Sequence, residues 1–335
     1  MIDLLKSLID IPAVSGFEYR GQQRLGDIVA QYVETVEFDA YGNCFGRIKT
    51  DGPRILIDAH FDTLGLMVKS IEDGGFLTFG AIGGIDPRTL IGASVTVLGD
   101  KAVYGVIGSK PPHILSAEDM KKAIKMEDLC IDTGYEKTTL EEMVSVGDCA
   151  VFNESPLTRL GQHRITSRYL DDRAGVAVAL QAAKRLQGSG LDITALVSVC
   201  EETNRLGAKI AAKAYDLALV IDVTHGETPD AMPYRTVPLG GGAAICKGPS
   251  LHGGYTNRLI ELLKKQDLPH QIEVEQGDPG TNSWMLQTTG TPCVMISIPL
   301  RYMHTGVETA DLRDLDACIE AACAGALLVK GGDAV

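Results

Sequence analysis

Histidines and carboxylates occur in five separated segments of this 335-residue sequence, in positions where they could act on one ligand. Four of the segments place them at or just beyond the end of a short apolar run that predicts a buried strand. The residues at these ends are His60, Glu201 with Glu202, Asp222 and His304. The fifth segment contributes Asp171, which precedes the apolar run of a predicted helix. Because ligands of an open α/β sheet bind at the carboxyl ends of its strands, we expect these side chains to face one crevice.

Converging carboxylates repel one another unless a cation lies between them, so this arrangement predicts a metal site. Imidazole and carboxylate ligands together favour Zn²⁺, Co²⁺ or Mn²⁺ over Ca²⁺. Two ions bridged by one carboxylate would use five of these ligands and leave one glutamate free as a base. Taken singly, each residue has an ordinary explanation, such as a solvated Glu-Glu pair or a helix cap at Asp222. Their common position favours the metal site.

The elements that must position these residues alternate between helix and strand patterns in residues 1–62 and 164–335. Residues 63–163 differ, because short β-type runs alternate there with glycine and proline turns. We therefore expect an α/β domain built from the two outer segments, with a small β-barrel or sandwich inserted between them. Locally, Ser15–Glu18 predicts a capping box with a helix running to about Val36, and Ala117–Met126 predicts an acidic helical segment.

The composition is that of an ordinary globular protein, with 45% apolar and 22% charged residues. The net charge of −13 argues against nucleic acid or an anionic membrane as a partner, and it favours cationic ligands and metal ions. We find no targeting or membrane-spanning segment. The eight cysteines are scattered without a C-x-x-C pair, which predicts reduced thiols in a cytoplasmic protein.

Longer motifs surround the candidate residues. They read PAVSGFE at 12–18, DAHFDTLG at 58–65, IGGID at 82–86, KPPHIL at 110–115, LDDRAG at 170–175, CEETNRLGA at 200–208, IDVTH at 221–225 and RYMHT at 301–305. Through these motifs, and over nearly its whole length, the chain resembles a family of dinuclear-metal aminopeptidases. That family includes the tetrahedral (TET) aminopeptidases, the glutamyl aminopeptidases and FrvX-like proteins, some of them once labelled endoglucanase M.

The resemblance implies a role for each candidate residue. One divalent ion would be held by His60, Asp171 and Asp222, and the other by Asp171, Glu202 and His304. Glu201 would be the general base that takes a proton from the attacking water, and Asp62 would orient the imidazole of His60. The peptide bond between Asp171 and Asp172 would be cis.

The resemblance also implies a fold and an assembly. Residues 1–62 and 164–335 would form a mixed-sheet α/β/α metallopeptidase domain, and residues 63–163 a PDZ-like β-barrel that contributes oligomer contacts. The substrates would be short peptides. The chain would form a homo-oligomer, from a dimer to a dodecamer whose active sites face an inner chamber.

Two loops depart from the family pattern. Relatives usually read E-E-V-G-L-R-G where this chain has EETNRLG at 201–207, and Gly-Thr-Asp is common where it has Gly280-Thr281-Asn282. The second change removes an acid near the expected substrate pocket. Because the candidate ligands are intact, we interpret both changes as bearing on specificity or assembly. We expect His225 near the pocket and His113 in a structural turn.

Other functions are compatible with the same residues. A metal-dependent deacylase or carboxypeptidase could use the same two-metal core, and a non-catalytic scaffold could retain the fold. The intact ligands and Glu201 argue against the scaffold. A glycosidase is disfavoured, because its pair of carboxylates differs from histidines and carboxylates arranged for metal ions.

Overall fold

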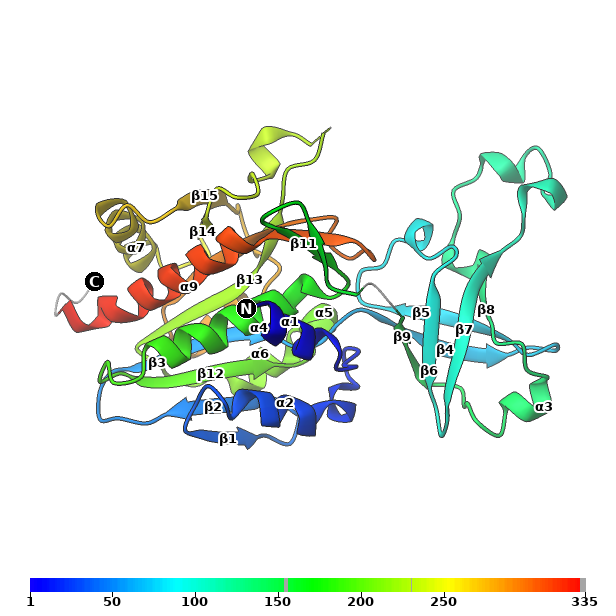
Figure 1. Cartoon of the computed structure of the whole chain (residues 1–335), viewed down its shortest axis with the longest axis horizontal. Helices are drawn as coiled ribbons and strands as arrows, with labels where there is room; N and C mark the ends of the chain where they lie inside the picture. The colour runs from blue at the N-terminus through cyan, green and yellow to red at the C-terminus, as the bar shows by residue number, and fades with distance from the viewer. Residues whose placement is uncertain (154–155, 230, 332–335) are drawn as a thin grey trace.

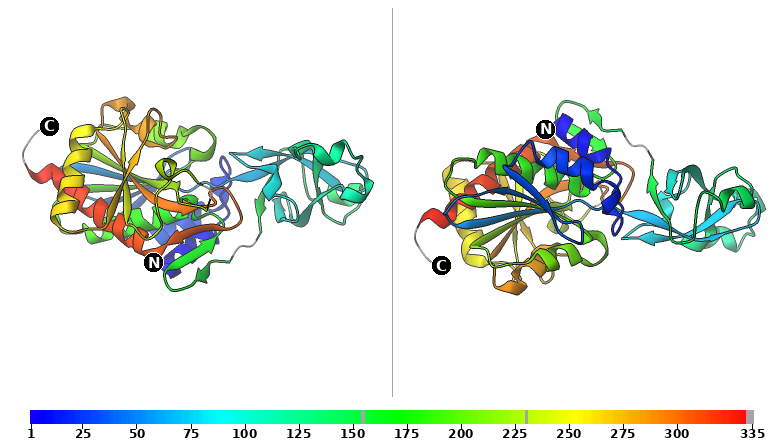
Figure 2. Two further views of the ribbon diagram at one scale, coloured as in Figure 1. Left: turned by 90° about the horizontal axis from the view of Figure 1, so that it is seen from above. Right: turned by 90° about the horizontal axis from the view of Figure 1, so that it is seen from below.

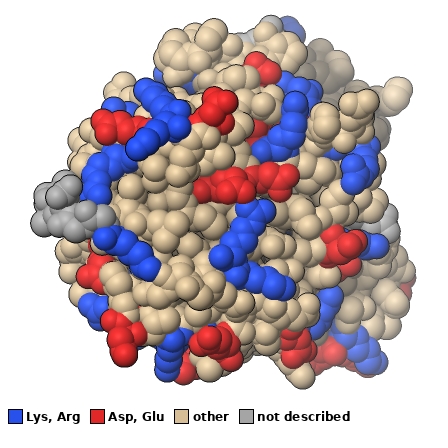
Figure 3. All heavy atoms as spheres, turned by 60° about the vertical axis from the view of Figure 1, so that its left-hand side comes forward, with Lys and Arg blue, Asp and Glu red and all other residues tan. Residues whose placement is uncertain are grey.

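The computed structural model describes residues 1–153, 156–229 and 231–331. The chain forms a larger α/β part, which contains the first and last helices, and a smaller β-barrel beside it (Figure 1). Views from above and below place the barrel at one end of an elongated molecule (Figure 2). On the face turned away from the barrel, basic and acidic side chains are interspersed (Figure 3). Among the described residues, no helix is both long and apolar enough to cross a membrane.

The larger part is organised around a mixed sheet, which has eleven strands in the described residues. The order is β1-β2-β12-β3-β13-β16-β17-β11-β10, and β14 joins β16 with β15 outside it. The strands are β1 (Thr35–Phe38), β2 (Cys44–Ile48), β3 (Arg54–His60), β10 (Thr158–Leu160), β11 (Arg164–Ser167), β12 (Asp192–Ser198), β13 (Leu217–His225), β14 (Ala243–Lys247), β15 (His270–Val274), β16 (Cys293–Arg301) and β17 (Glu308–Asp311). At the centre, β12, β3, β13 and β16 are parallel, so their carboxyl ends meet at one edge.

Helices cover both faces of this sheet. They are α1 (Ile2–Ile9), α2 (Gln22–Val29), α4 (Leu170–Arg185), α5 (Glu201–Asn204), α6 (Leu206–Ala211), α7 (Gly253–Lys265), α8 (Ser283–Leu286) and α9 (Leu312–Leu327). α4 and α9 pack on one face, while α6 and α8 pack on the other. The result is the mixed-sheet α/β/α arrangement that the sequence analysis expects.

Side chains of the central strands alternate between the two faces, and this alternation places the candidate residues. In β3, Ile57 belongs to the large core beneath α4, whereas Leu56 belongs to the smaller core beneath α6 and α8. His60 is in phase with Leu56, and Asp222 of β13 is in phase with Val220 of the same smaller core. Both side chains therefore emerge on the α6 and α8 face, at the carboxyl edge of the sheet.

The segment between β3 and β10 contains a closed β-barrel, as the sequence analysis expects. Its strands are β4 (Gly65–Ile71), β5 (Phe76–Ile82), β6 (Ser94–Leu98), β7 (Ala102–Ser109), β8 (Leu129–Asp132) and β9 (Cys149–Phe152), and α3 (Lys137–Leu140) accompanies them. The barrel has its own apolar core, which includes Leu66, Val68 and Val95. β10 also lies in the segment 63–163, but it pairs with β11 and belongs to the large sheet.

One expected helix is shorter than predicted, and another is absent. The carboxylate of Glu18 does not cap a long helix, because it accepts the N–H of Cys200 at 2.9 Å. The chain instead forms a 3₁₀ turn (Glu18–Arg20), then α2, and then β1, whose β-branched and aromatic residues pair with β2. Ala117–Met126 forms no α-helix, since residues 117–123 are all exposed and bury no apolar face. It contains a 3₁₀ turn at Asp119–Lys121, and a second turn begins at Met126.

Arg173 of α4 connects three elements that support the carboxyl edge. Its buried guanidinium donates to the carbonyl oxygens of Leu8 at 2.9 Å and Ile11 at 3.1 Å. The central carbon of the guanidinium lies 3.5 Å from the ring centroid of Phe61, the residue directly after His60. These contacts fix the end of α1 and the end of β3 against the start of α4.

We expect Arg173→Ala to lower the free energy of unfolding by about 3–5 kcal/mol, because two buried carbonyls lose their donors and a cavity opens beside Phe61. Arg185→Ala on the same helix removes a half-exposed side chain that pairs with Glu320, and should cost less than about 1 kcal/mol. Urea denaturation of both variants measures the difference. Equal losses would contradict the supporting role of Arg173.

Candidate metal centre

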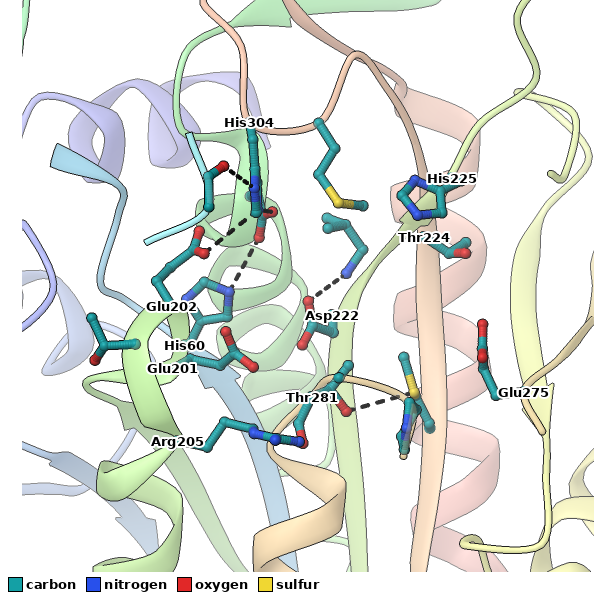
Figure 4. Close-up of a pocket in the computed structure, with 18 of the residues that line it drawn as sticks. His60, Glu201, Glu202, Arg205, Asp222, Thr224, His225, Glu275, Thr281 and His304 are labelled. Atoms are coloured by element: carbon teal, nitrogen blue, oxygen red, sulfur yellow. Dashed lines mark hydrogen bonds and ion pairs between the residues drawn. The ribbon is translucent and has the colours of Figure 1, made fainter. Parts of the chain in front are cut away.

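The carboxyl edge of the central strands borders a pocket of about 420 Å³. Figure 4 shows that its lining residues come from elements far apart in the sequence. The predicted residues in its lining are His60 at the end of β3, Asp171 at the start of α4, Glu201 and Glu202 at the start of α5, Asp222 in β13, and His304 in the loop between β16 and β17. Side chains from five separated segments therefore share one pocket.

Asp171 lies between the two histidines. Its Oδ1 is 3.1 Å from Nε2 of His60, and its Oδ2 is 3.3 Å from Nε2 of His304. The same nitrogen of His304 is 3.5 Å from Oε2 of Glu202. Although burial opposes it, these histidine contacts hold the pKa of Asp171 well below its usual range.

The ligand atoms form two groups that share Asp171. His60, Asp171 and Asp222 make up one group, and Asp171, Glu202 and His304 the other. Within each group, the ligand atoms lie within 4.8 Å of one another. Such an arrangement suits two cations that share a carboxylate.

Asp62 lies behind the pocket and supports three of its residues. Its Oδ1 accepts the N–H of Glu201 at 2.9 Å, and its Oδ2 accepts the N–H of Glu202 at 3.0 Å. Oδ1 is also 3.6 Å from Nδ1 of His60, whose nearer partner is the carbonyl oxygen of Asp62 at 3.1 Å. The sequence analysis anticipated the contact with His60 but not the two hydrogen bonds that fix the start of α5.

Glu308 at the start of β17 is a supporting residue that the sequence analysis missed. Its buried carboxylate accepts the N–H of Asp171 at 3.1 Å and the N–H of His304 at 2.9 Å. It thereby fixes the backbone of two candidate ligands from separate segments. Asp172 acts similarly, accepting the N–H of His60 at 3.3 Å, and the peptide bond between Asp171 and Asp172 is cis, as expected.

The electrostatics of the pocket favour a cation. Burial, reinforced by neighbouring carboxylates, raises the pKa of Glu201 to about 9, of Glu202 to about 8 and of Asp222 to about 7. Burial alone would lower the pKa of His304, but its contact with Asp171 raises it to about 10. In the absence of a cation, the acids therefore hold protons near neutral pH.

The residues present fit divalent metal ions. The donor set combines imidazole nitrogens with carboxylate oxygens, which Zn²⁺, Co²⁺ and Mn²⁺ accept. Oε1 of Glu201 is buried and has no hydrogen-bond partner among the described residues. The pocket thus has an acceptor that is still free to take a proton or a ligand.

The two altered loops have different positions relative to the pocket. Asn282 does not line it, because its buried amide donates to Asp58 at 2.9 Å and to Ser198 at 2.8 Å beneath the sheet edge. Its neighbours Gly280 and Thr281 do line the pocket, so the altered position lies near the pocket, as expected, but behind its wall. Arg205 does line the pocket, where it donates to both oxygens of Asp278. His225 lines the pocket as well (Figure 4).

Residues 42–320 match the M42 glutamyl aminopeptidase family. The lysyl aminopeptidase of Pyrococcus furiosus is 34% identical over 329 residues, which cover 96% of this chain and 95% of that protein. A TET aminopeptidase from the marine sediment archaeon Thaumarchaeota archaeon SCGC AB-539-E09 matches with a TM-score of 0.91 and 29% identity, covering 99% and 96% of the two chains. The Pyrococcus horikoshii TET1 peptidase, which can assemble into a tetrahedron or a large octahedral shell, matches with a TM-score of 0.85 and 32% identity, covering 97% and 98%.

We expect the metal-free protein to lose stability as the pH rises from 6 to 9. A carboxyl or histidine whose pKa is raised in the folded state stabilises the fold fully below its unfolded-state pKa. This stabilisation is lost as the pH rises through the folded-state pKa values, which are about 7 to 10 here. The lowered pKa of Asp171 acts only at acid pH, outside this window. In chelator, the thermal midpoint should fall by on the order of 10 °C across the window.

Saturating Zn²⁺ or Mn²⁺ should remove most of that fall, because the ions replace the protons on the acids. Glu202→Gln, which removes one of the raised carboxyls, should flatten the profile measured in chelator. A thermal midpoint that is constant from pH 6 to 9 in chelator would contradict this description of the cluster.

Proposed function

The chain belongs to the M42 glutamyl aminopeptidase family and hydrolyses peptide bonds, and from this premise we propose that it removes N-terminal residues from short peptides with two divalent ions and Glu201 as general base. The observation that carries the proposal is the pair of ligand groups joined at Asp171. Glu201, with a free buried oxygen, lies in the same pocket. A binding protein would have no need of a proton acceptor at that position.

Each of the two ligand groups would hold one ion. His60, Asp171 and Asp222 would hold the first, and Asp171, Glu202 and His304 the second. When bound, the ions would lower the pKa of a water molecule and polarise the scissile carbonyl. Zn²⁺ and Co²⁺ suit this donor set well, and Mn²⁺ suits it also.

Glu201 moves the proton. Its backbone is fixed by the hydrogen bond to Asp62, so its side chain has a defined position in the pocket. Oε1 accepts a proton from the attacking water and then transfers it to the amine that leaves. Bound divalent ions would lower the pKa of Glu201 from its raised value of about 9, so that the carboxylate could act near neutral pH.

Substrate access and assembly follow from the same picture. One of the two ions could also hold the free amine of a peptide, which would favour cleavage after the first residue. The tetrahedral assembly of the similar TET1 peptidase supports a homo-oligomer, with the barrel segment 63–163 contributing contacts. All eight cysteines are free thiols, which fits a reducing cytoplasm.

We expect Glu201→Gln to lower kcat by about 10²- to 10⁴-fold on free-amine aminoacyl anilides while the variant still binds metal. The substitution removes the proton acceptor but leaves both groups of ligands in place. Metal content by mass spectrometry and turnover should be measured on the same sample. Glu261→Gln, an exposed change on α7, is the matched control and should leave both unchanged.

We expect leucyl anilide to be cleaved at least about 100-fold faster than N-acetyl-leucyl anilide, because acetylation removes the free amine by which one of the ions would hold the substrate. Chelation should abolish the activity and added Zn²⁺, Co²⁺ or Mn²⁺ should restore it. Cleavage of only the blocked substrate would instead identify a deacylase.

A further inference from the structure

The wall of the pocket away from the two histidines is acidic as well. Glu273 of β15 and Glu275, two residues further on, line the pocket together with the metal-ligand candidates. Because side chains alternate along a strand, these two glutamates share one face. Figure 4 shows Glu275 on the side of the pocket across from His60 and His304.

Glu273 accepts hydrogen bonds from three neutral side chains. Its Oε1 accepts from the hydroxyl of Thr224, and its Oε2 accepts from the hydroxyl of Ser297 at 2.7 Å. The thiol of Cys246 is the third partner, and the four lone pairs of the carboxylate leave room for a further donor. Thr224 lies two residues beyond Asp222 on β13, so the carboxylate is roughly 7 Å along the strand from a candidate metal ligand.

No cation balances these glutamates. Among the described residues, neither Glu273 nor Glu275 takes part in an ion pair, and Arg205, which also lines the pocket, is paired with Asp278. Burial raises the pKa of Glu273 even though both hydroxyl hydrogen bonds oppose the rise. A cation brought by a ligand would therefore stabilise the ionised form of Glu273, which has no ion-pair partner among the described residues.

The space beyond the glutamates has room for a long side chain. Thr224, His225, Glu273 and Glu275 also line a second cavity of about 640 Å³, between β15 and the segment 233–237. The two cavities therefore adjoin each other at these four residues. Arg235 in the outer cavity lies 5.7 Å from the ring centroid of Tyr234.

We propose that Glu273, with Glu275 behind it, selects peptides whose first side chain is a long cation, that of lysine or arginine. The ammonium or guanidinium group donates to a free lone pair of Glu273 while the scissile bond lies beside Glu201. This inference rests on the proposed aminopeptidase function and names its substrate class. A neutral side chain of the same length leaves Glu273 without this further donor, which is why the site rejects it.

The test compares kcat/KM of the full-length, metal-loaded enzyme for lysyl, arginyl, norleucyl, leucyl and glutamyl anilides. Norleucine matches the aliphatic chain of lysine without its charge. We expect the wild type to prefer lysyl over norleucyl anilide by about tenfold or more, mainly through KM. Glu273→Gln should remove about tenfold or more of that preference, and Glu275→Gln should reduce it less.

Leucyl turnover in the same variants reports whether the fold and metal centre are intact, and Glu261→Gln serves as the control with unchanged ratios. A wild type that prefers norleucyl, leucyl or glutamyl anilide overturns the inference while leaving the aminopeptidase function standing. A lysyl preference that Glu273→Gln and Glu275→Gln both leave unchanged also overturns it. Failure to cleave any free-amine anilide contradicts the proposed function and this inference together.

Discussion

The contact of one carboxylate with two imidazoles is the constraint around which the site is arranged. Asp171 presents one oxygen to His60 and the other to His304, and further acids from α5 and β13 crowd the same space. Such a cluster is unfavourable without a cation, because burial and mutual repulsion drive Glu202 and Asp222 to hold protons. Two divalent ions would relieve that cost, and the same ions would provide the chemistry that the proposed mechanism needs.

Buried carboxylates behind the pocket accept backbone N–H groups and so hold the segments that carry the candidate ligands in place. Asp62 holds the start of α5, Glu308 joins the backbones of Asp171 and His304, and Asp172 holds His60. Each of these acids accepts N–H groups from a segment distant in sequence, so it fixes where a ligand lies without occupying its coordinating atoms. Metal binding and positioning are thus assigned to different acids: some would bind metal, and the others position the candidate ligands.

The candidate ligands could be predicted because they depend on local signals. Apolar runs before His60 and Asp222 indicate buried strands, and parallel strands bring their carboxyl ends to one edge. Tertiary contacts decided the rest. Glu18 matches a capping box in sequence, yet its carboxylate accepts the backbone N–H of Cys200 instead. The roles of Glu308 and Glu273 depend on hydrogen-bond partners that no local sequence pattern reveals.

The number of divalent ions bound per chain tests the central claim most directly. Native mass spectrometry of the wild type, Asp171→Asn and Asp222→Asn would count them. Because Asp171 belongs to both ligand groups, we predict two ions in the wild type, loss of both in Asp171→Asn, and retention of one in Asp222→Asn. A wild type that binds a single ion, or an Asp171→Asn variant that still binds two, would contradict the account.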